Sequence, residues 1–146
     1  RVHDVDERLR VKRFLKRATV EWTGEQALAM TVGFCEVARH WGLRFLACSM
    51  LPTHVHLVIG RTTRDIAAVM NQLKGRASGE LVAQGIHPFQ SVFNRKGERE
   101  TCWTRRGWNV FLDSVADMRR AIRYVEANPV KEGRRAQRWS FVRECG

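Results

Sequence analysis

Two histidines separated by one residue stand in the apolar stretch LPTHVHLVIG at positions 51–60. Side chains alternate between the two faces of a β-strand, so His54 and His56 are expected to share one face. The core face would hold the aliphatic residues Val55, Leu57 and Ile59. With a rise of about 3.3 Å per residue, the two imidazoles lie about 7 Å apart and can converge on one metal ion. The pattern indicates metal ligands, although polar residues on a solvated sheet face would give the same spacing.

The second candidate is Tyr124, the only tyrosine in the chain. It falls in a segment whose apolar stripe consists of Val115, Met118, Ile122 and Val125. At 100° per residue, Tyr124 lies about 130° from the centre of that stripe, so it is not expected in the core. Asn128 follows four residues later on the same helix face and presents an amide beside the phenol. An ordinary surface tyrosine followed by a helix-end asparagine is the alternative interpretation.

The elements around the histidines are predicted from capping and periodicity. Thr23 and Gln26 have capping-box spacing and begin a helix over residues 24–41. Two strands of an antiparallel pair are predicted at LRFLACSM and HVHLVI, with a break between them. A further helix follows, capped by Thr63 or Asp65, with apolar positions at Ile66, Val69, Met70 and Leu73.

The second half of the chain is less uniform. Residues 86–103 fit either a long loop or a hairpin that turns at RKGE. The segment WNVFLD predicts another strand, and a helix capped by Ser114 is expected to stop at Pro129. Together the elements predict an α+β fold in which helices pack on an antiparallel sheet.

Composition limits the classes of protein. The 146 residues suit one compact domain, and the net charge of +11 favours a phosphate-rich partner, above all nucleic acid. No apolar stretch approaches the roughly 18 residues of a membrane span, so we expect no membrane partner and a cytoplasmic location. The four cysteines have irregular spacing and are expected to be reduced thiols.

The segments PTHVHLVIG and RYVEANPVKEG together resemble the HUH single-tyrosine transposases, in particular the REP-associated tyrosine transposases. The segment QRWSFV is similar to one that follows their catalytic helix, and the resemblance extends over about residues 23–142. It implies a ferredoxin-like, RRM-like HUH fold with a basic arm (1–22), a catalytic domain (23–133) and a tail (134–146). The family's sheet opens with a strand before the first helix. Residues 1–22 show no strand pattern, which leaves a missing first strand as one interpretation.

The resemblance also implies the chemistry. His54 and His56 would be metal ligands, Tyr124 the nucleophile, and Asn128 the third ligand where other members have glutamine. The implied activity is a metal-dependent single-strand DNA endonuclease and strand transferase that forms a 5′-phosphotyrosine on hairpin-bearing DNA, as a monomer or homodimer. The implied cation is magnesium or manganese, whereas imidazoles alone favour zinc, nickel or copper.

The basic residues expected to bind DNA phosphates are Lys74, Arg76, Arg105, Arg106, Arg119, Arg120 and Arg123. The segment CWTRRGW alternates aromatic and guanidinium groups, which is a pattern of single-strand stacking platforms, although tryptophans are usually partly buried. Two alternatives stay open. One is a domesticated nucleic-acid-binding derivative without catalysis, and the other is a structural zinc site formed by the two histidines with Cys48 or Cys102.

Overall fold

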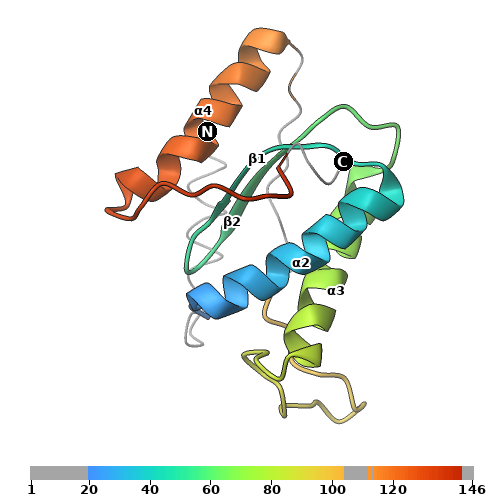
Figure 1. Ribbon diagram of the computed structural model, residues 1–146. Helices are drawn as coiled ribbons and strands as arrows, with labels where there is room; N and C mark the ends of the chain where they lie inside the picture. Colours follow the sequence, from blue (N-terminus) through green and yellow to red (C-terminus); the bar gives the residue numbers. More distant parts are fainter. Residues whose placement is uncertain (1–19, 104–111, 113, 143–146) are drawn as a thin grey trace, which may run out of the picture.

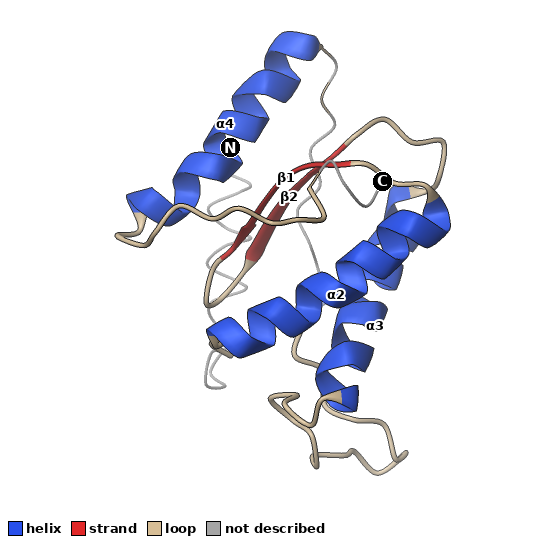
Figure 2. Ribbon diagram, viewed as in Figure 1, coloured by secondary structure: helices blue, strands red, loops and turns tan. Residues whose placement is uncertain are grey.

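The polypeptide has an α+β fold in which helices pack on an antiparallel two-stranded sheet, as the sequence predicts. The computed structural model describes residues 20–103, 112 and 114–142. In chain order, the elements of this part are α2 (Gly24–Trp41), β1 (Phe45–Met50), β2 (Val55–Ile59), α3 (Ile66–Ala83) and α4 (Val115–Lys131). The sheet lies between α4 on one side and the pair α2 and α3 on the other (Figure 1, Figure 2).

The hairpin of β1 and β2 fixes which side chains point to which helix. The register pairs Cys48 with Leu57, Ser49 with His56, and Met50 with Val55. Side chains directly opposite each other in an antiparallel pair project from the same face of the sheet. The predicted inward residues Val55, Leu57 and Ile59 do pack against the core that α2 and α3 form. Ser49 and His56 therefore project toward the opposite face, which α4 covers.

Helix α2 begins and ends where the sequence predicts. The Thr23 hydroxyl accepts a hydrogen bond from the Gln26 N–H, and the Gln26 side chain accepts one from the Thr23 N–H, which completes the capping box. The helix ends at Gly42, whose φ of 64° is left-handed and favours glycine. The buried side of α2 contributes Met30 and Phe34 to the core.

Helices α2 and α3 lie in direct contact, and Gly33 is the reason that they can. A Cβ atom at this position would lie 2.7 Å from the Ala77 nitrogen and equally close to the Arg76 carbonyl. Of the two N-caps considered for α3, the structure has Asp65, whose carboxylate accepts a hydrogen bond from the Ala68 N–H. The crossing of α2 and α3 thus depends on a residue without a side chain.

Helix α4 covers the other face of the sheet. Its N-cap is Ser114, as predicted, and Val125 packs in a small cluster with Ala47 and Val58. The prediction that the helix stops at Pro129 is wrong, because α4 continues to Lys131. Pro129 lacks the N–H that would donate to the Val125 carbonyl, but the turn after it is closed by the N–H groups of Glu132 and Arg134, which donate to the carbonyls of Asn128 and Pro129.

The segment after α4 returns to the main core. The Gln137 amide donates to the Met50 carbonyl at 2.7 Å and accepts from the Met50 N–H at 2.7 Å, and so it satisfies both backbone groups at the edge of β1. Phe141 is buried and meets Phe45 edge to face, with ring centroids 5.2 Å apart. The described part of the expected tail is therefore integral to the fold.

Some predicted elements lie partly or wholly outside the residues that the structure describes. Between α3 and α4, Phe93 pairs with Arg99 in an isolated bridge, and Gly97 has a φ of 78°, so this part forms a short hairpin. The strand predicted at WNVFLD lies outside the described residues except for Leu112, and so does most of the basic arm. No helix in the described ranges is long and apolar enough to span a membrane.

The cysteines differ from the prediction of four reduced thiols. Cys48 and Cys102 are free and buried, whereas Cys35 is disulfide-bonded, so that prediction is wrong for Cys35. Irregular spacing in the sequence does not reveal which cysteines the fold brings together.

Candidate functional site

The hairpin turn brings the two histidines together. Pro52 and Thr53 form the turn, and Leu51 and His54 flank it with backbone hydrogen bonds of 2.9 and 3.4 Å. Strand β2 therefore begins at Val55, one residue later than predicted. The rings of His54 and His56 nonetheless lie 4.7 Å apart between centroids, at an interplanar angle of 89°. The Thr53 hydroxyl lies 2.9 Å from the His54 Nδ1 and can hold that ring in place.

Helix α4 places Tyr124 beside this pair. The Tyr124 ring centroid lies 6.1 Å from that of His56, at an angle of 85°. Tyr124 is 54% exposed, so the residue is accessible from solvent. Residues far apart in the sequence, from the hairpin and from the last helix, thus meet at one place, as the two sequence patterns predict.

Asn128 lies one turn after Tyr124, at the face of α4 that packs on the sheet. It is 8% exposed, which is unusual for an asparagine, and it follows by three residues Val125, which packs against Ala47 and Val58 of the sheet. In the described ranges, no three His, Cys, Asp or Glu side chains form a group that could hold a metal ion. A three-ligand set around His54 and His56 in this part of the chain would therefore need a donor of another type, such as an amide oxygen.

Electrostatics keep His56 in the form that binds cations. Burial lowers the pKa of His56 below its ordinary value, the neighbouring His54 lowers it further, and Glu132 opposes both effects. A neutral imidazole offers a ring nitrogen lone pair, whereas a protonated one does not. The lowered pKa therefore favours the neutral form of His56.

Two charged residues at the end of α4 join the site and were not predicted. The Lys131 ammonium lies 5.1 Å from the centroid of the Tyr124 ring, in cation–π geometry, and Glu132 acts on His56. Both residues follow Tyr124 by about two helical turns, so helical periodicity places them on its face. The sequence signal was missed because the helix was expected to stop at Pro129.

The predicted DNA-binding residues that the structure describes belong to two helices, which pack on opposite faces of the sheet. Arg119, Arg120 and Arg123 are exposed on α4, close to Tyr124 in the sequence. Lys74 and Arg76 belong to α3, which packs on the opposite face of the sheet (Figure 1). Arg105 and Arg106 lie outside the described residues.

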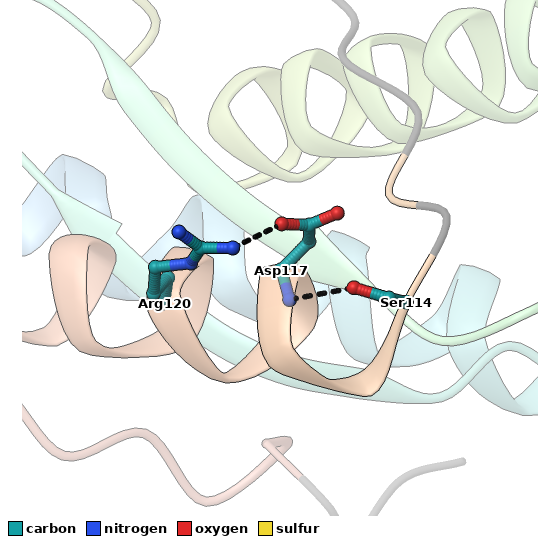
Figure 3. A network of polar contacts seen from close by, with 3 residues as sticks. All are labelled: Ser114, Asp117 and Arg120. Carbon is teal, nitrogen blue, oxygen red and sulfur yellow. Dashed lines mark hydrogen bonds and ion pairs between the residues drawn. The ribbon is translucent and has the colours of Figure 1, made fainter.

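Several basic residues already have acidic partners. Figure 3 shows Arg120 paired with Asp117, whose backbone N–H donates to the N-cap hydroxyl of Ser114. Arg76 lies 4.0 Å from Glu36. The positive charge on α4 that remains free for phosphates is therefore smaller than the sequence alone suggests.

The structure does not support the stacking role predicted for Trp103 or the zinc-ligand role considered for Cys48. Trp103 packs edge to face on Trp22, with centroids 5.0 Å apart, and its indole N–H donates to Ser78 at 2.8 Å. Trp103 is thus a packing residue rather than an open stacking platform, and Trp108 lies outside the described residues. Cys48 projects into the main core, on the sheet face away from His56, where burial raises its pKa.

Cys102 is also buried in the main core, with its sulfur 3.9 Å from the Ser78 hydroxyl. The alternative of a structural zinc site formed by the two histidines with Cys48 or Cys102 is therefore not supported, because both cysteines belong to the core on the other side of the sheet from His56.

Comparison of the chain with protein-family models, with curated proteins and with solved structures found no match. Arguments about function therefore depend on the residues and on their geometry.

Proposed function

We propose that the protein is a metal-dependent single-strand DNA endonuclease and strand transferase, that is, a transposase of the HUH single-tyrosine type. The observation that supports this most strongly is the meeting of three side chains. The Tyr124 ring lies 6.1 Å from His56, and the His56 ring lies 4.7 Å from His54. Phosphoryl transfer to a protein side chain at neutral pH needs a nucleophile and a cation that polarises the phosphate, and these three side chains would supply the nucleophile and two ligands for the cation.

The residues present fit a divalent cation. His54 and His56 would hold it through ring nitrogens and Asn128 through its amide oxygen, and we propose magnesium or manganese as the ion. When bound, the cation supplies Lewis-acid polarisation of the scissile phosphate. The Thr53 hydroxyl, 2.9 Å from His54 Nδ1, orients the first of these ligands.

Tyr124 performs the covalent step. Its phenolic oxygen attacks the phosphorus of a DNA phosphodiester, and the bond from phosphorus to the 3′ oxygen breaks. The phenol gives up its proton, the departing 3′ oxygen gains one, and the products are a 5′-phosphotyrosine and a free 3′-hydroxyl. The energy of the broken bond is conserved in the new ester, so a second 3′-hydroxyl can reverse the reaction on another strand without ATP.

Lys131 assists the same step. Its ammonium lies 5.1 Å from the centre of the Tyr124 ring. A fixed cation at this place attracts the phosphate and stabilises the negative charge that develops during attack. Exposed Arg119 and Arg123 extend the positive surface along α4. The proposed partner is single-stranded or hairpin DNA, bound by a monomer or homodimer in the cytoplasm.

The experiment that tests this proposal is incubation of the protein with single-stranded hairpin DNA and manganese or magnesium, followed by denaturing electrophoresis. The expected result is a DNA adduct that survives denaturation. No adduct should form when the cation is chelated before the DNA is added. DNA binding without any adduct would contradict the proposed catalysis and would favour a nucleic-acid-binding derivative of the same fold.

A further inference from the structure

The hydroxyl of Ser49 has no hydrogen-bond partner within the described part of the chain, although Ser49 is completely buried. A buried polar group without a partner is destabilising and is rare in folded proteins. A serine at the next-to-last position of β1, where alanine would avoid that cost, therefore needs a reason.

The register of the hairpin places Ser49 directly opposite His56. Opposite residues in an antiparallel pair project from the same face, with their Cβ atoms about 5 Å apart. The Ser49 hydroxyl and the His56 imidazole therefore enter the same layer between the sheet and α4. This register makes the His56 ring the neighbouring polar group across the strand pair that the hydroxyl would face.

The two histidines differ in what supports them. His54 has the Thr53 hydroxyl 2.9 Å from its Nδ1. No hydrogen bond of the His56 ring occurs among the described residues, and its contacts there are the rings of His54 and Tyr124. A metal-binding histidine almost always donates its second ring N–H to an outer partner, which fixes its tautomer and orientation. Within the described ranges, the His56 ring has no such partner and the Ser49 hydroxyl makes no hydrogen bond.

We propose that Ser49 is the positioning residue of His56. In this proposal the serine side chain rotates from the position seen in the structure, its hydroxyl oxygen accepts the N–H of one ring nitrogen, and the other nitrogen then presents its lone pair to the ion. Thr53 and Ser49 serve His54 and His56 in the same way. This inference rests on the proposed function, because it assigns His56 to the cation.

The first test measures the affinity of the whole chain for Mn²⁺ by calorimetry, without DNA. Ser49→Ala should weaken binding about 10- to 100-fold, which is the usual effect of removing an outer partner. Ser49→Thr keeps the hydroxyl and should retain most of the affinity. The matched control is Cys48→Ala, which also removes one buried polar atom from β1 but on the other face of the sheet, and it should leave the affinity unchanged.

The second test uses no metal. Nitrogen-15 spectra of the histidine rings report the tautomer of His56 in the metal-free protein. Wild type and Ser49→Thr should hold one dominant tautomer, and Ser49→Ala should shift toward a mixture. An unchanged tautomer ratio in Ser49→Ala overturns the inference. If the wild type binds no divalent ion, the proposed function fails, and the tautomer ratio still decides the role of Ser49.

Discussion

Replacing Gly33 by alanine should destabilise the protein, although the same replacement on a free helix surface is stabilising. The added Cβ would lie 2.7 Å from the Ala77 nitrogen and from the Arg76 carbonyl carbon and oxygen. These are backbone atoms of α3, which cannot rotate away as a side chain can. Overpacking of this kind costs about 1–3 kcal/mol, and the contact with three backbone atoms puts Gly33→Ala near the upper end.

The intrinsic gain from replacing glycine by alanine within a helix offsets about 1 kcal/mol of that cost. We therefore expect a net loss of about 2 kcal/mol in the free energy of unfolding, which lowers Tm by about 6 °C in a domain of this size. The matched controls are Gly75→Ala and Gly79→Ala in α3, where an added Cβ would meet nothing within 4 Å.

Each control should gain about 0.5–1 kcal/mol. Chemical denaturation and calorimetry give both quantities. If Gly33→Ala proves as stabilising as the two controls, α2 and α3 do not cross at this point.

Further predictions concern charge. Arg119→Gln should reduce the slope of log affinity for single-stranded DNA against log salt by about 0.7, as expected for one phosphate contact, in fluorescence anisotropy titrations. Arg120→Gln should reduce it less, because Asp117 already pairs with that guanidinium; equal effects would contradict this. Burial and the neighbouring His54 lower the pKa of His56 in the folded state. Below about pH 6.5 the unfolded chain therefore binds more protons than the folded one, and the free energy of unfolding should decrease as the pH decreases. His56→Gln should flatten that dependence, and an unaltered pH profile would argue against it. Lys131→Met should slow adduct formation at saturating DNA while Lys131→Arg preserves it; equal rates would exclude an electrostatic role.

Local patterns in the sequence were enough to predict much of the fold. Capping residues and apolar spacing defined α2, and strand alternation correctly placed Val55 and Leu57 on the core face and His56 on the other face. These features depend only on neighbours in the chain. The position of Tyr124 beside His56 is a long-range contact, and it was expected because two patterns occurred together, not because spacing required it.

The remaining features depend on three-dimensional packing. Helices α3 and α4 pack on opposite faces of the sheet, so Lys74 and Arg76 on α3 are separated from Tyr124 on α4. Ser49 became a candidate only through the strand register and its burial. Lys131 entered the site because α4 tolerates Pro129 in its last turn. The local sequence pattern does not show which helix covers which face of the sheet, and the positions of these residues relative to Tyr124 depend on that packing.

The most direct test of the central claim is adduct formation by wild type and Tyr124→Phe on the same single-stranded hairpin DNA with manganese. The substitution removes one hydroxyl and keeps the ring, so folding and DNA affinity should persist, as checked by circular dichroism and anisotropy. We predict a denaturation-resistant adduct for the wild type, mapped by mass spectrometry to the peptide with Tyr124, and none for Tyr124→Phe. Because the chain has a single tyrosine, an adduct formed by the Phe variant would contradict the single-tyrosine mechanism itself.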